Sequence, residues 1–138
     1  MNGHTDKPVM LYVEDDDSAV FLLETALKEA SIEIELFHVG DGEQALAWLN
    51  KDGAFGNAAG PDLILLDLNL PKKNGLDVLA EMQRNPRLRA IPVVVFSSSS
   101  LDSDRRRSLE LGARDYIKKP PTFAAFVDAV RSACALLP

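Results

Sequence analysis

Short apolar runs alternate with longer amphipathic stretches along the whole chain. The clearest runs are Val9–Val13, Leu63–Leu66 and residues 93–96. Runs this short and rich in branched aliphatic residues are typical of strands buried on both faces of a parallel sheet. Residues 32–39 are also predicted to form a strand, and the polar residues within it indicate an edge or a half-exposed face. Residues 116–117 form the last and shortest predicted strand.

Apolar residues recur at helical spacing between and after these strands, which predicts amphipathic helices. Four such sets are Val20, Leu23, Ala26, Leu27 and Ala30; Ala45, Leu46 and Leu49; Leu76, Leu79 and Met82; and Phe123, Phe126, Val127 and Val130.

Polar residues and glycine mark the expected helix ends. Asp17 and Asp41 are predicted N-caps of the first and second helices. Asp102 or Ser103 is predicted to start a further helix, which would end at Gly112, because glycine is common just past a helix C-terminus. The chain is therefore predicted to consist of a strand followed by a helix, repeated five times.

This repeated order predicts an α/β fold, a doubly wound parallel sheet of five strands with five helices on its two faces. The length of 138 residues fits one domain. We expect residues 1–7 to form an N-terminal tail and residues 8–138 to form the domain, with no effector domain after it. The Gly- and Ala-rich residues 51–61 are predicted to be a mobile surface loop.

Charge and cysteine content narrow the functional classes. The formal net charge is −6, which argues against binding nucleic acid or an anionic membrane surface. The single cysteine, Cys134, cannot form an internal disulfide and is expected to pack within a helix, so a reducing compartment fits best. No apolar run approaches the ~18 residues of a membrane span, and the polar N-terminus does not resemble a signal peptide. We therefore expect a cytoplasmic protein.

Chemically active residues follow the predicted strands at the point where each strand ends. Glu14 and Asp15 follow the first strand, Asp67 the third, Ser97 the fourth and Lys119 the fifth. The carboxyl ends of the strands of a doubly wound sheet lie along one rim, where such proteins bind their ligands.

A divalent cation would relieve the repulsion among the acids gathered at this rim. Carboxylate and carbonyl oxygens are the ligands that Mg²⁺ prefers. A zinc site is not expected, because the two histidines, His4 and His38, are isolated from each other and from the one cysteine.

Four motifs at these strand ends resemble those of the response-regulator receiver domain, the CheY-like module of two-component signalling. They are VEDD at 13–16, LLDLNLPKKNG at 65–75, VVFSSS at 94–99 and YIKKP at 116–120. Ser97 lies 30 residues after Asp67 (97 − 67) and Lys119 lies 52 after it (119 − 67), and both spacings fit the family. The resemblance covers about residues 8–136 and implies the flavodoxin-like strand order 2-1-3-4-5.

The resemblance implies a role for each residue of the predicted site. Asp67 would accept a phosphoryl group from a histidine kinase or a small phosphodonor. Asp15, Asp67 and the backbone carbonyl of Asn69 would bind Mg²⁺ directly, and Glu14 would reach the ion through water. Lys119 would pair with the phosphoryl oxygens. Such a protein catalyses only its own phosphorylation and dephosphorylation, so it is a signalling switch rather than an enzyme.

The same resemblance implies a conformational switch. Ser97 matches the switch hydroxyl and Tyr116 the switch aromatic. Their movement on phosphorylation would alter the surface of the fourth helix, fifth strand and fifth helix. Pro120 matches a proline whose preceding peptide bond is cis in this family.

The sequence PDLILLDLNLPKKNG and the long loop before Pro61 resemble the single-domain regulators paired with phytochrome-type histidine kinases. This likeness implies a sensor histidine kinase of the bacteriophytochrome class as partner and a homodimer as the assembly. Phe123 and Phe126 of the last helix are candidates either for such a contact or for the core.

Three other classes of protein are alternatives to a receiver domain. A haloacid-dehalogenase-type phosphatase needs a second acid two residues after the nucleophile, where this chain has Asn69. A flavodoxin needs a first loop that cradles phosphate, and the acids at residues 14–17 would repel one. A receiver-like docking module that is never phosphorylated stays open as an alternative.

Overall fold

The computed structural model describes residues 7–51, 53, 56 and 60–138. Most of the predicted tail, including His4, and much of the predicted loop at 51–61 lie outside the described residues. The boundary between tail and domain at residue 8 and the mobility of this loop therefore stay predictions.

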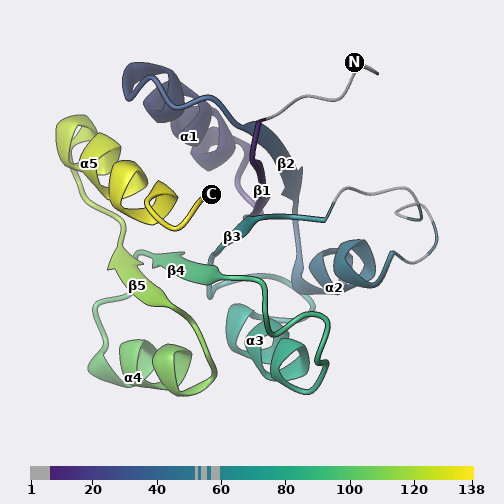
Figure 1. Ribbon diagram of the computed structural model, residues 1–138. Helices are drawn as coiled ribbons and strands as arrows, with labels where there is room; N and C mark the ends of the chain where they lie inside the picture. Colours follow the sequence, from purple (N-terminus) through teal and green to yellow (C-terminus); the bar gives the residue numbers. More distant parts are fainter. Residues whose placement is uncertain (1–6, 52, 54–55, 57–59) are drawn as a thin grey trace, which may run out of the picture.

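Five parallel strands form one sheet in the order β2-β1-β3-β4-β5, which confirms the predicted fold class and strand order. A helix follows each strand in the chain (Figure 1). The strands are β1 (Val9–Val13), β2 (Glu35–Val39), β3 (Leu63–Leu66), β4 (Val93–Ser97) and β5 (Asp115–Lys118), and the helices are α1 (Asp17–Glu29), α2 (Gly42–Asn50), α3 (Gly75–Gln83), α4 (Asp102–Glu110) and α5 (Phe123–Cys134).

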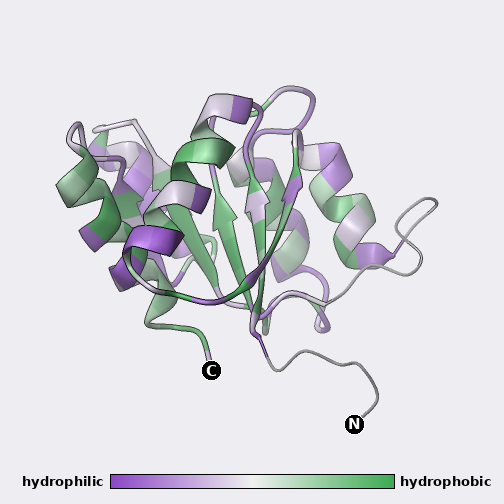
Figure 2. Cartoon of the chain, turned by 90° about the horizontal axis from the view of Figure 1, so that it is seen from above, coloured by the Kyte–Doolittle hydropathy of each residue, from purple (hydrophilic) through white to green (hydrophobic). Residues whose placement is uncertain are grey.

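The helices cover both faces of the sheet, with α1 and α5 on one side and α2, α3 and α4 on the other (Figure 1). The central strands are apolar, whereas the helices carry polar residues on their outer sides (Figure 2). Each face has its own apolar core, because successive side chains of a strand point to opposite faces. The α1/α5 side includes Met10, Tyr12, Leu23, Phe96 and Phe126, and the other side includes Leu11, Val13, Leu46, Leu79 and Met82.

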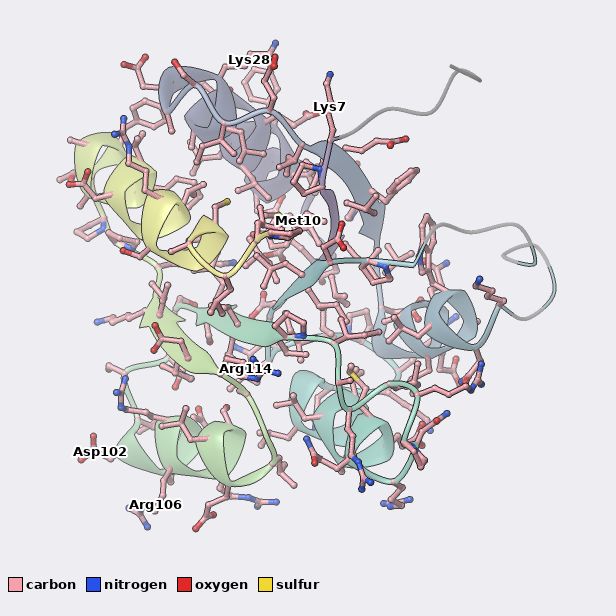
Figure 3. All side chains as sticks on the ribbon, in the orientation of Figure 1. Lys7, Met10, Lys28, Asp102, Arg106 and Arg114 are labelled. Carbon is pink, nitrogen blue, oxygen red and sulfur yellow. The ribbon has the colours of Figure 1, made fainter. Side chains whose placement is uncertain are left out.

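Helix α4 is attached to the sheet mainly through polar contacts. Ser108 is its buried residue, and Asp102 and Arg106 project away from the sheet (Figure 3). Arg105 donates a hydrogen bond of 3.3 Å from its guanidinium to the backbone oxygen of Tyr116. Since no apolar residue of α4 is buried, hydrogen bonds such as this one help to hold the helix in place.

The element ends differ from the prediction in two places. The N-cap of α1 is Asp16 and not Asp17, because the Asp16 carboxylate accepts a 2.9 Å hydrogen bond from the Ser18 N–H and Asp17 is already helical. Strand β2 begins at Glu35 and not at residue 32, because the chain first turns through Ser31, whose φ is 57°.

Other predicted ends are confirmed. Asp41 caps α2 by accepting a 2.7 Å hydrogen bond from the Gln44 N–H, and α4 begins at Asp102. Gly112, with a φ of 101°, follows α4 in the left-handed region that glycine tolerates.

The loop between β3 and α3 passes close to the strand end that carries Asp67. The Gly75 N–H donates a 3.0 Å hydrogen bond to the Leu68 carbonyl. A Cβ at Gly75 would lie 2.4 Å from the Asp67 carbonyl oxygen, so only glycine allows this approach. The loop after Asp67 is thereby folded back against the residue it follows.

Candidate functional site

Three carboxylates meet at the carboxyl ends of β1 and β3. Glu14 and Asp15 follow β1, Asp67 follows β3, and the two strands pair with Val13 opposite Leu66. One carboxylate oxygen from each acid lies within 4.8 Å of the others. The predicted convergence of these acids at one rim of the sheet is therefore present in the structure.

The three acids differ in their exposure to solvent. Glu14 is 3% exposed and Asp67 is 7% exposed, whereas Asp15 is exposed. The side of the cluster next to the sheet is thus buried, and the side formed by Asp15 is open to solvent. A cation arriving from solvent would meet the Asp15 carboxylate on this open side.

Lys119 supplies a positive charge to the buried side of the cluster. Its Nζ lies 2.5 Å from Glu14 Oε1 and 3.6 Å from Asp67 Oδ2. The backbone N–H of Lys119 donates a 2.7 Å hydrogen bond to the Ser97 carbonyl, which fixes this residue to the end of β4. The ammonium group offsets the repulsion between the two buried acids.

The prediction of a cis peptide bond before Pro120 is wrong. No peptide bond among residues 7–51, 53, 56 and 60–138 is cis, so the bond joining Lys119 to Pro120 is trans. Trans is the preferred isomer of an X–Pro bond by about 0.5–1 kcal/mol. In this chain the trans bond already places the Lys119 ammonium against Glu14.

Four further groups hold Glu14 and the loop that begins with it. The Tyr12 hydroxyl donates to Glu14 Oε1 at 3.3 Å, and the Asp16 N–H donates to Oε2 at 3.3 Å. His38 Nε2 lies 2.6 Å from the Glu14 carbonyl oxygen and donates to it, since a carbonyl oxygen can only accept. The Glu14 N–H donates to the Val39 carbonyl at 3.1 Å.

Tyr12 stays protonated in this setting. Its side chain is fully buried, and burial raises the pKa of the phenol well above its ordinary value. The negative charges of Glu14 and then Asp67 raise this pKa further. The hydroxyl is therefore a hydrogen-bond donor throughout the ordinary pH range.

Ser97 and Tyr116 lie on neighbouring strands and connect to the same loop residue. The Ser99 N–H donates to Ser97 Oγ at 3.1 Å, and the Tyr116 hydroxyl donates to the Ser99 carbonyl at 2.8 Å. Ser99 Oγ donates to Asp104 of α4 at 2.6 Å. Both predicted switch residues are buried, at 0% and 7% exposure, and Ser99 links them to α4.

Asn69 lies in the loop directly after Asp67 and is exposed. Its N–H donates to Asp67 Oδ1 at 3.3 Å, which turns the loop back toward the acid. The residues present suit a hard divalent cation, because carboxylate oxygens converge and a backbone carbonyl is close by in the chain.

The roles of Tyr12, His38 and Ser99 in this region were not predicted from the sequence. The contact of Tyr12 with Glu14 could have been predicted. Tyr12 lies two residues before Glu14, and side chains two residues apart along a strand point to the same face of the sheet. The contacts of His38 and Ser99 depend on strand pairing and loop conformation, which a single sequence does not specify.

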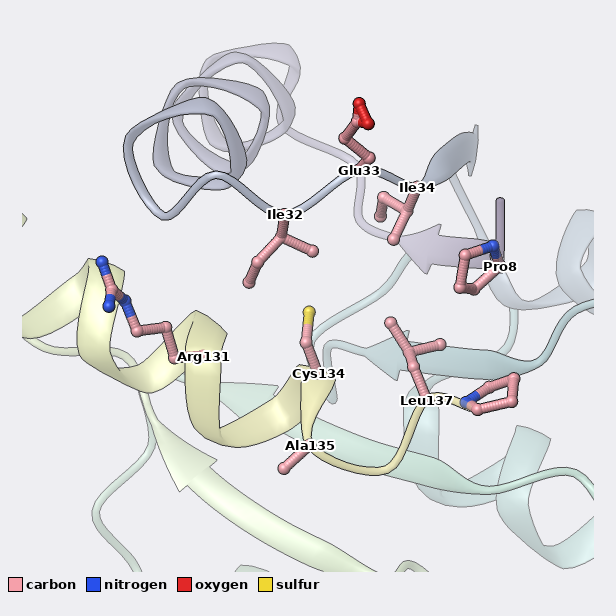
Figure 4. Close-up of a pocket in the computed structure, with 9 residues that line it drawn as sticks. Pro8, Ile32, Glu33, Ile34, Arg131, Cys134, Ala135 and Leu137 are labelled. Atoms are coloured by element: carbon pink, nitrogen blue, oxygen red, sulfur yellow. The ribbon is translucent and has the colours of Figure 1, made fainter. Parts of the chain in front are cut away.

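An apolar hollow of about 330 Å³ lies at the opposite end of the sheet, next to the start of β1 (Figure 4). Pro8, Ile32, Ile34, Cys134 and Leu137 contribute to its lining. Burial raises the pKa of the Cys134 thiol to about 11. This thiol is therefore a packing group and a poor nucleophile at neutral pH, as predicted from its place in an apolar helix.

The fold and the acidic cluster with its lysine define a receiver domain, and comparison with known sequences agrees. The sequence profile of the response regulator receiver domain matches residues 10–131. The chain belongs to this family. It is therefore a signalling receiver of the two-component phosphorelay class.

Known relatives of this chain are response regulators, and some of them are phytochrome or bacteriophytochrome response regulators. Response regulator Rcp1 of Synechocystis sp. (strain ATCC 27184 / PCC 6803 / Kazusa) is 43% identical over 120 residues, covering 86% of this chain and 82% of the relative. The phosphorylated cyanobacterial phytochrome response regulator RcpA superimposes with a TM-score of 0.88 at 38% identity, covering 95% of this chain and 94% of the other. The Mn²⁺-bound form of Rcp1 gives a TM-score of 0.86 at 39% identity, covering 95% and 99%.

Within the described ranges, none of the helices has the length and apolar character needed to cross a membrane.

Proposed function

We propose that Asp67 accepts a phosphoryl group from the phosphohistidine of a sensor histidine kinase. An oxygen of Asp67 forms the new bond to phosphorus as the bond from phosphorus to the histidine nitrogen breaks. The observation that carries this proposal is the meeting of Glu14, Asp15 and Asp67 within 4.8 Å, with Lys119 Nζ at 2.5 Å from Glu14 and 3.6 Å from Asp67.

The charges around Asp67 suit phosphoryl transfer, which depends mainly on positioning and electrostatic stabilisation. Lys119 is close enough to Asp67 to pair with oxygens of a phosphoryl group bound there. Asp15, Asp67, the carbonyl of Asn69 and, through water, Glu14 would hold Mg²⁺. When bound, the ion would offset negative charge on the transferred group.

Ser97 and Tyr116 would transmit the change to the surface of α4, β5 and α5. Ser97 lies at the end of β4, next to the strand that carries Asp67, and its hydroxyl is tied to Ser99. A movement of Ser97 toward a phosphoryl group would disturb Ser99, and with it the contacts to Tyr116 and Asp104. Since α4 is attached mainly by polar contacts, such a change would alter its position.

The similarity to phytochrome response regulators supports a phytochrome-type histidine kinase as the partner. We also propose a homodimer as the assembly, which light scattering during size exclusion would test. A chain that stays monomeric at high micromolar concentration would contradict the dimer.

The net charge of −6 argues for a protein rather than a nucleic acid as the output target. We place the protein in the cytoplasm, which suits a chain with one cysteine.

Intact mass spectrometry tests the central proposal. With acetyl phosphate and Mg²⁺ the protein should gain one phosphoryl group, and EDTA should prevent this gain. Asp67→Asn should abolish it, whereas Asp17→Asn, an equal change of charge at an exposed position in α1, should not. If neither small phosphodonors nor any histidine kinase yields an adduct, the chain is a docking module instead.

A further inference from the structure

Glu14 Oε1 accepts hydrogen bonds from two donors. One is Lys119 Nζ at 2.5 Å, and the other is the Tyr12 hydroxyl at 3.3 Å. Tyr12 and Glu14 are two residues apart at the end of β1, so their side chains leave the same face of the sheet. The Tyr12 hydroxyl is fully buried, and Glu14 is the partner it reaches.

Phosphorylation of Asp67 would require Lys119 to exchange its contact with Glu14 for one with the phosphoryl group. In the structure its ammonium group is closer to Glu14 than to Asp67. Under the proposed function it must turn toward the phosphoryl oxygens on Asp67. Glu14 is only 3% exposed, and a buried carboxylate that loses its direct bond to an ammonium group is destabilised unless other donors remain.

We infer that Tyr12 is a positioning residue, whose hydroxyl supports the Glu14 carboxylate when Lys119 moves to the phosphoryl group. This inference rests on the proposed function. Among the described residues, the donors left to the Glu14 carboxylate are then Tyr12 on Oε1 and the Asp16 N–H on Oε2. Once Lys119 no longer shares Oε1, the long bond from the Tyr12 hydroxyl strengthens. Glu14 therefore releases Lys119 at a lower free-energy cost, and the phosphorylated state forms faster.

The hydroxyl, and not the ring, is the group that distinguishes this role from ordinary packing. The ring of Tyr12 belongs to the apolar core on the α1/α5 side of the sheet. A phenylalanine would fill the same space without a hydrogen-bond donor. Tyr12→Phe therefore keeps the core and removes only the support for Glu14.

The test is a double-mutant cycle of Tyr12→Phe and Glu14→Gln, measured on the full chain. The initial rate of phosphoryl gain from acetyl phosphate with Mg²⁺ is followed by intact mass. We expect Tyr12→Phe to slow the rate about tenfold, as suits one hydrogen bond to a charged group. In the Glu14→Gln background it should change the rate less than twofold, because a neutral amide does not need the support.

Urea denaturation without phosphodonor checks that each variant folds. An equal rate for Tyr12→Phe and wild type overturns the inference and leaves the proposed function intact. An equal loss in both Glu14 backgrounds also overturns it, because the effect would then come from packing. If the wild type gains no phosphoryl group, the proposed function fails and the inference fails with it.

Discussion

The hydroxyl of Tyr116 donates a hydrogen bond of 2.8 Å to the backbone carbonyl of Ser99, which joins β5 to the loop after β4. The side chain of the same loop residue reaches α4, because Ser99 Oγ donates a hydrogen bond of 2.6 Å to the Asp104 carboxylate. Ser99 is therefore the point at which β4, β5 and α4 meet. Because α4 has little buried apolar surface, these bonds carry much of its attachment.

Tyr116→Phe should loosen this junction without disturbing the core. The Ser99 carbonyl loses its partner, which should lower the free energy of unfolding by about 1 kcal/mol. Amide hydrogen exchange of residues 98–105 should become roughly fivefold faster. Thr25→Ala is the matched control, because it also removes a hydroxyl that donates to a backbone carbonyl, that of Phe21 on α1. Unchanged exchange at 98–105 in Tyr116→Phe would contradict the role of this bond.

Asp15→Asn should weaken the binding of Mg²⁺ or Mn²⁺ in calorimetric titration by roughly tenfold or more, equivalent to about 1.4 kcal/mol. Asp15 is the exposed member of the three-acid cluster, so this change removes the proposed ligand on the open side. Asp17→Asn removes the same charge from an exposed position in the first turn of α1 and should leave the affinity within about twofold. Equal losses in the two variants would mean that general negative charge, and not the cluster, attracts the ion.

Gly75→Ala should destabilise the fold and the site together. The added Cβ would lie 2.4 Å from the Asp67 carbonyl oxygen and 2.8 Å from the Leu68 Cα, both backbone atoms that cannot rotate away. We expect a loss of about 1–3 kcal/mol in urea denaturation, together with weaker divalent binding. Gly40→Ala places its Cβ where nothing lies within 4 Å and should change stability by about 0.5 kcal/mol or less. Similar losses in both variants would show that the close approach at Gly75 does not constrain the loop.

The strand pattern predicted most of the fold because the buried strands of this sheet are continuous apolar runs. The prediction erred at residues 32–34, where Ile32 and Ile34 are apolar yet precede β2. These residues pack against the core from the irregular segment that follows the turn at Ser31, and apolar content alone does not separate this case from a strand.

The meeting of Glu14, Asp15 and Asp67 could be predicted because each acid lies within two residues of the carboxyl end of a strand in a parallel sheet. The contacts that hold Glu14 could not be predicted from the sequence. The hydrogen bond from His38, for example, depends on the pairing of β1 with β2 and on a side-chain rotamer. The isomer of the bond before Pro120 was predicted wrongly, because a proline in the sequence restricts φ but leaves both isomers accessible.

The thiol of Cys134 should respond to pH in a way that reports its burial in the apolar hollow. Burial raises its pKa from an ordinary 9.0 to about 11. Only the thiolate is alkylated, so the rate with iodoacetamide should rise about tenfold per pH unit and level off near pH 11, whereas the urea-unfolded chain should level off near pH 9. The folded chain holds this proton more tightly, so the thiol's contribution to stability is complete below pH 9 and is lost as pH rises toward 11. Cys134→Ser identifies the labelled site, and a plateau at the same pH in folded and unfolded chains would contradict burial as the cause.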